Sequence, residues 1–452
     1  MSYSVDLDQM LMARERRASI QNKMMAKARP DQCLVCLTLN IAGEVKRTPM
    51  TRMLFDEGVK EFEALGLELT DSFFIDEATG SEALWIVNEE GTRVKPLLEE
   101  LEDSFAAARL FDFDVIVPGG QKLSRAAGRR CLICDRPAAE CSRSRRHGLE
   151  EVKWATGRLL KEFCAEKLAQ AAHGALLDEL YTTPKPGLVD MNNNGAHADM
   201  DVPLFEKSAD ALIPYFRDAA LLGMNGCGME SLRERGKAAE TEMFAATGGI
   251  NTHKGLVYSM GLLLAGMGRS LSESEVCADD TSAMTATSSC IACAAALAKE
   301  DASKQLEKSM NEPTTNGGAV YKAFGAKGAT GEAAAGFPGA LYCGSRLSYY
   351  RQNGFKEPGT LALCDSMAVL EDTNLLHRGG GEGLEHVKNA ASRICEMPEA
   401  ERPGALSALD KDLIARNLSP GGSADMLALA FLLERWQRIS DTLFVNERGD
   451  QQ

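Results

Sequence analysis

One stretch of sequence divides the chain: Glu150–Tyr181 reads EEVKWATGRLLKEFCAEKLAQAAHGALLDELY. Apolar residues recur through it at helical spacing, and no proline interrupts it. The pattern predicts one continuous helix rather than a flexible linker. We place a domain boundary inside this helix near Leu168, which gives a first domain of residues 1–168 and a second of residues 169–452.

The residues before this stretch alternate between helix and strand patterns. Helical periodicity is predicted for residues 7–28, 49–65 and 94–108, and strands for residues 32–41, 67–75, 82–87 and 109–117. From the first strand onward the order is β-α-β-β-α-β, which is typical of a split βαβ, ferredoxin-like sheet. We therefore expect an N-terminal α+β domain with its helices on one face of the sheet.

The residues after the stretch are rich in Ala, Leu, Met and Glu, and runs of β-branched residues are scarce. Turns rich in glycine and proline separate predicted helices at residues 204–222, 231–246, 256–267 and 424–438. This pattern predicts an all-α domain. The fold class is therefore a multidomain one, with an N-terminal α+β domain followed by an all-α helical domain.

The overall composition is that of a globular protein, with 44% hydrophobic and 25% charged residues in 452. A net charge of -15 argues against a general binder of nucleic acid or membranes. The first residues contain no basic region followed by an apolar run, so no secretory signal is predicted. The odd number of cysteines, 13, favours reduced thiols and a cytoplasmic location.

Two islands of small residues precede predicted helices: ATGGINTHKG at Ala246–Gly255 and SPGGSAD at Ser419–Asp425. Exposed backbone N–H groups at a helix start bind anions, so these islands predict contacts with a phosphorylated ligand. The expected phosphate- or nucleotide-binding residues are Asn251, His253, Lys254, Ser419, Gly421, Gly422 and Ser423. The chain lacks the GxxxxGK[ST] motif and a Rossmann fingerprint after a strand.

Titratable residues gather in the segment between two predicted helices, Tyr181–Asp201. Lys185 lies between two prolines that fix the loop. Such a loop between rigid helices favours a site over a solvated connection. Asp190, His197, Asp199 and Asp201 are candidate metal ligands or acid/base groups, and Glu332, Asp372 and Arg378 lie in two further glycine-rich segments.

In the first domain, Asp112 and Asp114 lie two residues apart on a predicted strand. This spacing places both carboxylates on one face, where they could hold Mg²⁺ against a phosphoryl group. The alternative is a strand end that faces solvent. A basic segment follows, with Arg125, Arg129, Arg143, Arg145 and Arg146 as candidate ligands of a triphosphate or an acidic protein. A solvated basic loop is the alternative there.

The same segment carries four residues of zinc-ligand type: Cys131, Cys134, Cys141 and His147. The first pair has CxxC spacing, whereas the second half departs from the commonest zinc spacings. Structural zinc, free thiols that pack a tight loop, and a redox pair all remain open at this point.

Several motifs resemble two known enzyme families. The segments ALLDELYTTPKPGLVD, GAHADMD, ATGGINTHKG, GEAAAGFPGAL, EDTNLLHRGG and NLSPGGSADMLA resemble triphosphoribosyl-dephospho-CoA synthase. The segments RERRASIQ, LTLNIAG, RLFDFDVI and GRRCLICDRPAAECSRSRRH resemble the citrate lyase holo-acyl-carrier-protein synthase, a phosphoribosyl-dephospho-CoA transferase. The chain therefore looks like a fusion of these two consecutive enzymes.

The first resemblance implies that ATP and 3′-dephospho-CoA combine with loss of adenine. It also implies Mg²⁺ on the triphosphate and a base for the attacking hydroxyl. Under this resemblance Lys185, His253, Lys254 and Arg378 would bind phosphates. The residues available for metal and base roles would be Asp190, Asp199, Asp201, Glu240, Glu332 and Asp372, with Asp199 and Asp201 as Mg²⁺ ligands.

The second resemblance implies transfer of the product to a serine of the citrate lyase acyl-carrier (gamma) subunit, with release of pyrophosphate. Asp112 and Asp114 would hold Mg²⁺, and the arginines from Arg125 to Arg146 would bind the pyrophosphate or the carrier. The same chemistry could instead serve malonate decarboxylase. A zinc-containing protein that binds nucleic acid or a partner is a third hypothesis, and the acidic composition speaks against it.

Overall fold

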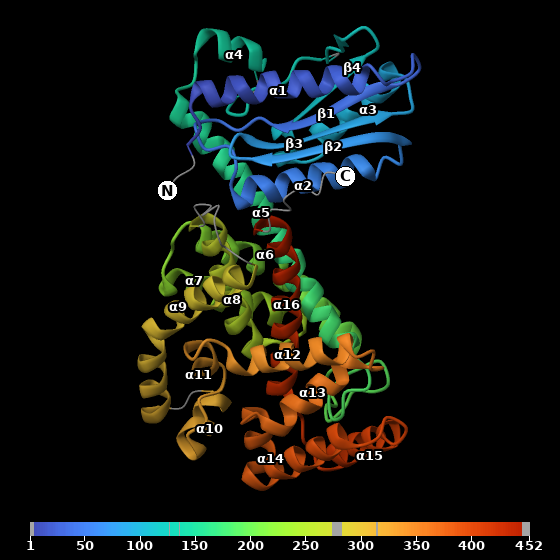
Figure 1. Cartoon of the computed structure of the whole chain (residues 1–452). Coiled ribbons are helices and arrows are strands. Elements are labelled where there is room, and N and C mark those ends of the chain that lie inside the picture. The colour runs from blue at the N-terminus through green and yellow to red at the C-terminus, as the bar shows by residue number, and fades with distance from the viewer. Residues whose placement is uncertain (1–3, 126, 135, 274–282, 313–314, 445–452) are drawn as a thin grey trace. The chain divides into compact units, whose positions relative to one another are not determined.

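The computed structural model describes residues 4–125, 127–134, 136–273, 283–312 and 315–444 (Figure 1). They form two compact units. The first contains the described residues up to Cys164, together with residues 271–273 and 442–444. The second contains residues 165–270 and 283–441.

The first unit is built on a five-stranded antiparallel sheet with the order β2-β3-β1-β4-β5. Its strands are β1 (Cys33–Leu39), β2 (Leu69–Glu77), β3 (Gly80–Val87), β4 (Phe111–Val117) and β5 (Gln121–Lys122). Its helices are α1 (Leu7–Met25), α2 (Pro49–Glu63), α3 (Gly91–Asp103), the 3₁₀ helix η1 (Ala106–Leu110), α4 (Ala138–Ser144) and the beginning of α5 (Leu149–Tyr181). The predicted succession of strands and helices is confirmed, whereas membership of the ferredoxin-like class stays a prediction.

The sheet is covered on both faces. On one face, Leu34 and Cys36 of β1 pack against Met24 of α1. On the other, Phe62 of α2 stacks on Trp85 of β3, with ring centroids 4.2 Å apart. The expectation that the helices lie on one face is therefore wrong. The physical reason lies in β1 itself, where successive residues are apolar and buried, as in strands enclosed on both sides.

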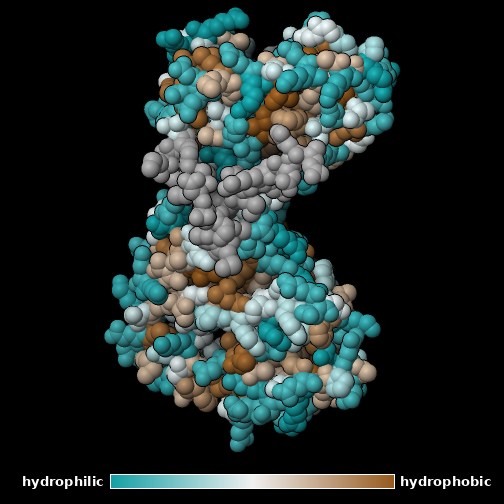
Figure 2. Space-filling model, viewed as in Figure 1, coloured by the Kyte–Doolittle hydropathy of each residue, from teal (hydrophilic) through white to brown (hydrophobic). Residues whose placement is uncertain are grey.

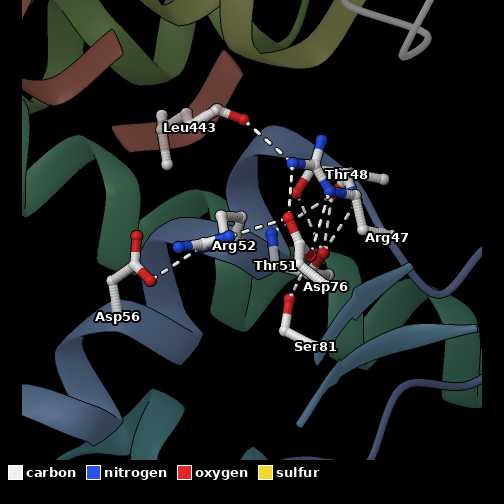
Figure 3. A network of polar contacts seen from close by, with 8 residues as sticks. All are labelled: Arg47, Thr48, Thr51, Arg52, Asp56, Asp76, Ser81 and Leu443. Atoms are coloured by element: carbon white, nitrogen blue, oxygen red, sulfur yellow. Dashed lines mark hydrogen bonds and ion pairs between the residues drawn. The ribbon is translucent and has the colours of Figure 1, made fainter. Parts of the chain in front are cut away.

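A polar network joins the start of α2 to the sheet (Figure 3). Asp76 of β2 accepts hydrogen bonds from Arg47 at 2.9 Å, Arg52 at 2.7 Å and Ser81 at 2.7 Å. Arg47 also donates to the carbonyl of Leu443 at 3.1 Å. Burial alone would raise the pKa of Asp76, but the guanidinium groups of Arg47 and Arg52 hold it below its usual range.

The second unit is mostly helical, as predicted, and contains no strand among its described residues. After the end of α5 come α6 (Val202–Met224), α7 (Met229–Ala246), α8 (Lys254–Glu273), α9 (Ala283–Asn311), α10 (Asn316–Phe324), α11 (Gly328–Ala334), α12 (Pro338–Gln352), α13 (Pro358–Val369), α14 (Thr373–Glu396), α15 (Arg402–Ala415) and α16 (Gly421–Phe444).

Glycines let α6 and α8 approach closely in this unit. A Cβ atom added to Gly223 of α6 would lie 2.0 Å from the carbonyl oxygen of Ala265, and one added to Gly268 of α8 would lie 2.2 Å from that of Ala220. Tyr215 of α6 donates to the carbonyl of Val257 at 3.1 Å. The Tyr215 hydrogen bond holds the beginning of α8, where the first glycine island ends, whereas the glycine contacts lie in the second half of this helix.

None of the helices in the described part of the chain combines the length and the hydrophobicity of a membrane span. In Figure 2, hydrophilic residues predominate on the visible face outside the grey segments, and hydrophobic residues are scattered among them.

Candidate functional site

A cavity of about 360 Å³ lies beside β4 in the first unit, and charged side chains line it. Asp112 and Asp114 both face this cavity, as their spacing predicts, while Phe113 between them is buried. Asp112 accepts a hydrogen bond from Arg129 at 2.9 Å, and Asp114 forms an ion pair with Lys122 at 2.5 Å. Binding of Mg²⁺ by the two carboxylates stays a prediction.

Two buried residues of α3 complete the floor of the cavity. Glu102 accepts from the backbone N–H of Phe113 at 2.8 Å, and Lys95 donates to the Phe113 carbonyl at 2.9 Å. They supply the partners that a neighbouring strand would otherwise give to the edge of β4. Glu102 also pairs with Arg129 at 2.6 Å and Arg125 at 2.9 Å. Burial raises the pKa of Glu102 although these donors oppose the change.

Sequence reasoning missed Lys95, Glu102 and Lys122. No local motif marks them, because their partners lie elsewhere in the sequence. Of the predicted arginines, Arg125 and Arg129 line the cavity. Arg143, Arg145 and Arg146 do not; they lie exposed at the end of α4 and just beyond it, without an ion pair to another described residue.

The four residues of zinc-ligand type come together. One ligand atom from each of Cys131, Cys134, Cys141 and His147 lies within 4.8 Å of the others. Burial raises the pKa of the Cys141 thiol to about 11, and the neighbouring thiols add to this. At Cys131 burial acts in the same direction, but backbone N–H donors outweigh it and lower the pKa of that thiol.

In the second unit, the loop between α5 and α6 is folded by its own side chains. Asp190 is buried and accepts from the backbone N–H groups of Lys185 at 2.8 Å, Asn192 at 2.7 Å and Asn193 at 3.1 Å. The Asn193 side chain in turn donates to Asp410 at 2.9 Å. Asp190 therefore stabilises the conformation of this loop.

Lys185 and His253 are both buried. Lys185 forms an ion pair with Glu179 at 2.5 Å, and the Nδ1 atom of His253 lies 2.7 Å from the hydroxyl of Ser208. Burial, together with the charge of Lys185, lowers the pKa of His253 to about 3. At neutral pH this imidazole is therefore uncharged, and it can meet a phosphate only as a hydrogen-bond donor.

One carboxylate connects the starts of α14 and α16. Asp372 caps α14 by accepting from the backbone N–H of Asn374 at 2.9 Å, and it also accepts from the N–H and hydroxyl of Ser423 at 2.8 and 3.0 Å. A Cβ on Gly422 would lie 3.0 Å from Asp372, which explains the small residue there. Burial raises the pKa of Asp372 against these hydrogen bonds. The carboxylate of Asp372 therefore already binds the N–H and hydroxyl of Ser423 in the second glycine island.

Asp425 is a carboxylate of a different kind. It is half-buried one turn inside α16, with no hydrogen bond or ion pair to another described residue. Burial, followed by the charges of Asp372 and Glu179, raises its pKa well above the usual range. A Cβ on Gly255, at the start of α8, would lie 3.2 Å from the Asp425 carboxylate. The starts of α8, α14 and α16 therefore meet at this group.

Sequence reasoning did not single out Asp425 or Glu179. The SPGGSAD island contains Asp425, but its sequence points only to the small residues and the helix start. Glu179 lies within the helical stretch predicted to join the domains, and only the fold brings it to Lys185.

A second polar group surrounds His197. Its Nε2 atom lies 2.9 Å from the hydroxyl of Ser419, and Arg378 donates to the Ala196 carbonyl and to Asn417, each at 3.0 Å. Burial and the charge of Arg378 lower the pKa of His197. Burial also lowers the pKa of Arg378, while the nearby Asp199 acts in the opposite direction.

The remaining predicted residues fall into two groups. Asp201 caps α6 through the N–H of Leu204 at 2.9 Å, and Glu332 accepts from the N–H groups of Gly339 at 2.6 Å and Ala340 at 3.1 Å at the start of α12. By contrast, Glu240 pairs with Lys254 at 3.1 Å on partly exposed side chains. Asn251 accepts from the N–H of Lys254 at 3.3 Å. Their roles in metal or phosphate binding stay predictions.

The chain is similar to two enzyme families along its length. The model of the CitG family, ATP:dephospho-CoA triphosphoribosyl transferase, matches residues 165–442. That of the CitX family, apo-citrate lyase phosphoribosyl-dephospho-CoA transferase, matches residues 5–163. Protein CitXG of Haemophilus influenzae is 32% identical over 446 residues, which cover 94% of this chain and 95% of that protein. The chain belongs to the CitXG family.

Other relatives agree. Protein CitXG of Leuconostoc mesenteroides is 30% identical over 95% of this chain and 97% of its own length. The 2-(5′′-triphosphoribosyl)-3′-dephosphocoenzyme-A synthase of Haemophilus ducreyi is 36% identical over 66% of this chain and 97% of its own length. The resemblance to a fusion of two enzymes is confirmed, and the protein is a transferase of the CitXG family.

Proposed function

We propose that the second unit joins ATP to 3′-dephospho-CoA. The 2′-hydroxyl oxygen of dephospho-CoA attacks the anomeric carbon of the ATP ribose, and the bond to adenine breaks. A base takes the hydroxyl proton, and adenine is protonated on the nitrogen that loses the ribose, so that in net terms one proton passes from the hydroxyl to adenine. The product is 2′-(5′′-triphosphoribosyl)-3′-dephospho-CoA. The observation that carries this proposal is the meeting of three helix starts with Lys185, His253 and Asp425.

Asp425 is our candidate for the base. Burial raises its pKa, and a carboxylate with a raised pKa is a stronger base than an ordinary one. Its oxygens are also not engaged by described protein groups, whereas those of Asp190 and Asp372 hold backbone N–H groups. Asp199 and Glu240 are candidates for Mg²⁺ on the triphosphate, with Asp201 beside Asp199 in the sequence. Lys185, Lys254 and Arg378 would supply positive charge to the phosphates.

We propose that the first unit performs the second transfer. A serine hydroxyl of the citrate lyase acyl-carrier subunit attacks the α-phosphorus of the triphosphate. A P–O bond to serine forms, the bond to pyrophosphate breaks, and the serine proton passes to the departing pyrophosphate or to water. Asp112 and Asp114 would hold Mg²⁺ at the cavity beside β4, and Arg125 and Arg129 would stabilise the leaving pyrophosphate. The exposed Arg143, Arg145 and Arg146 would bind an acidic carrier surface.

The finer structural assignments also belong to this proposal. We propose domains of residues 1–168 and 169–452 and a ferredoxin-like class for the first, which the strand order β2-β3-β1-β4 supports. The cysteines among the described residues are free, which fits a reducing compartment such as the cytoplasm.

Mass analysis of the products tests both reactions. ATP plus 3′-dephospho-CoA is expected to yield free adenine, and addition of the apo carrier is expected to yield a carrier heavier by one phosphoribosyl-dephospho-CoA group. Absence of adenine would reject the first reaction. The citrate lyase and malonate decarboxylase carriers are offered separately, and labelling of the malonate carrier alone would reject our choice of partner.

A further inference from the structure

We propose that Cys131, Cys134, Cys141 and His147 bind Zn²⁺ in a closed structural site that holds the basic segment of the first unit in place. The site goes beyond the two transfer reactions, since none of its four ligands lines the cavity beside β4.

Two distances between ligand atoms are close to those of a tetrahedral zinc site, and all four atoms lie within 4.8 Å of one another. The Sγ atoms of Cys134 and Cys141 lie 3.6 Å apart, and Cys134 Sγ lies 3.4 Å from Nε2 of His147. Tetrahedral zinc with Zn–S of about 2.3 Å and Zn–N of about 2.0–2.1 Å requires S···S of about 3.8 Å and S···N of about 3.6 Å. Cys134 and Cys141 are free thiols in this structure, since a disulfide would bring their sulfurs to about 2.0 Å.

The local backbone is folded so as to present these four atoms. The Cys131 N–H donates to the Arg136 carbonyl at 2.8 Å, and the Ala138 N–H donates to the Arg129 carbonyl at 2.7 Å, which closes a tight loop around the first two cysteines. The short helix α4 then carries Cys141. Arg145 adopts a left-handed conformation with φ of 48°, which ends α4 and turns the chain toward His147.

Hydrophobic burial does not account for this fold. Cys141 is the only buried residue among the described residues between 121 and 150. A segment with so little apolar burial needs another source of stability, and small folds of this kind commonly use a metal. Free thiols packing a loop, the alternative to zinc, would need a core that this segment lacks.

The ligand types select the metal. Three thiolates with one imidazole, without a place for substrate, are typical of structural zinc, whereas iron–sulfur clusters are usually held by four cysteines. The second nitrogen of His147 faces the carboxylate of Glu151 at 4.0 Å. A carboxylate on that side is a common orienting partner of a metal-bound histidine.

Metal binding would affect the candidate active site by fixing the position of Arg129. The backbone of Arg129 is hydrogen-bonded to Ala138 beside the cluster, while its side chain binds Asp112 and Glu102 in the cavity. Loss of zinc is therefore expected to release Arg129 and weaken the carrier reaction, with adenine release unaffected.

Metal analysis of the full-length protein tests the proposal. Protein purified under reducing conditions with zinc in the medium is expected to hold about one Zn²⁺ per chain. After exchange for Co²⁺, the absorption of tetrahedral cobalt thiolate is expected. Cys134→Ser is expected to bring the zinc content close to zero. Cys227→Ser, which changes a cysteine outside the cluster, is expected to leave it unchanged.

Chelation of the folded wild-type protein provides a second measurement, in case Cys134→Ser does not fold. Trypsin is expected to cleave the basic segment several-fold faster after removal of zinc, while the far-UV spectrum stays the same. Zinc-free protein from zinc-supplemented cells, full zinc content in Cys134→Ser, or an unchanged cleavage rate after chelation would overturn the proposal.

Discussion

At the scale of single residues, the carboxylates of the second unit differ in their hydrogen-bond partners. Asp190, Asp201, Glu332 and Asp372 accept backbone N–H groups, and their removal would first of all disturb the fold. Asp425 has no such partner in the part of the chain that the structure describes, and burial disfavours its charged form. A group that is costly to bury and bonded to nothing is typical of a functional site rather than a structural one.

Asp425→Asn is therefore expected to stabilise the protein while abolishing adenine release. The folded protein raises the pKa of Asp425 above the ordinary value of about 3.9, so ionisation costs stability as the pH rises above about 4. Near pH 7 the variant should therefore unfold at a higher temperature than the wild type. Its rate of adenine release should fall at least about 100-fold, as for loss of a general base. Thermal unfolding and adenine quantification measure the two effects.

Asp412→Asn is the matched control. Asp412 lies on the same unit but forms partly exposed ion pairs with His386 and Arg416, whose hydrogen bonds lower its pKa. Its replacement should cost less than about 0.5 kcal/mol and leave adenine release unchanged. Full activity in Asp425→Asn would remove this residue from the mechanism.

A second pair of neighbouring residues compares a buried ion pair with an exposed one. Asp76→Asn breaks the network of Arg47 and Arg52 and should lower the free energy of unfolding by about 2–3 kcal/mol. The folded pKa of Asp76 is lowered, so its contribution is present above about pH 4 and is lost as the pH falls through the folded pKa. Thermal unfolding at pH 7 and at pH 3 measures this.

Glu77→Gln removes the adjacent exposed pair with Arg16 and should cost less than about 1 kcal/mol. Equal losses for Asp76→Asn and Glu77→Gln would contradict the importance of burial at this network.

At the scale of elements, the close packing of α6 against α8 depends on glycines, and substitution of these glycines tests it. Gly268→Ala drives a methyl group against the backbone of Ala220 and should cost about 1–3 kcal/mol through overpacking. Gly404→Ala in α15 meets open space and should instead stabilise by about 0.5–1 kcal/mol, because alanine favours helix. Thermal unfolding of the two variants should therefore shift in opposite directions.

Local sequence signals predicted the elements well where a start signal was present. The helix expected from residue 49 begins at Pro49, because Thr48 caps it and proline fits the first turn. The same reasoning could not assign α1 to the second face of the sheet, since that depends on packing against β1 and β3. It also gave no sign of the short α4 or β5, which have little apolar periodicity.

At the scale of the whole molecule, the sequence predicted the two enzyme families and many residues of the candidate sites. It did not predict which hydrogen-bond and ion-pair partners these residues have in the fold. Asp112 and Asp114 face one cavity because strand alternation is a local property. The capping of two helices by Asp372, or the pairing of Glu102 with Arg129, joins residues that only the fold brings together. Motifs therefore located the candidate sites, and tertiary contacts separated scaffold from candidate catalytic groups.

A fusion of two enzymes allows complementation between variants. Asp112→Asn should lose carrier labelling yet keep adenine release, and Asp425→Asn should lose both because it makes no intermediate. Mixed together, the two variants should restore labelling after a lag, since the intermediate must diffuse between molecules rather than between linked sites. Mass analysis of the carrier over time measures this. Failure of every mixture to label, with each variant folded, would argue against a freely released intermediate.

Lys95 and Glu102 also limit the pairing of β4 with strands of other molecules. They form hydrogen bonds with both the N–H and the carbonyl of Phe113, so neither backbone group is free to pair with another strand. A strand from a neighbouring molecule therefore cannot pair with Phe113, and extension of the sheet is blocked at that residue. The opposite edge strand, β2, instead carries the exposed acidic side chain of Asp71.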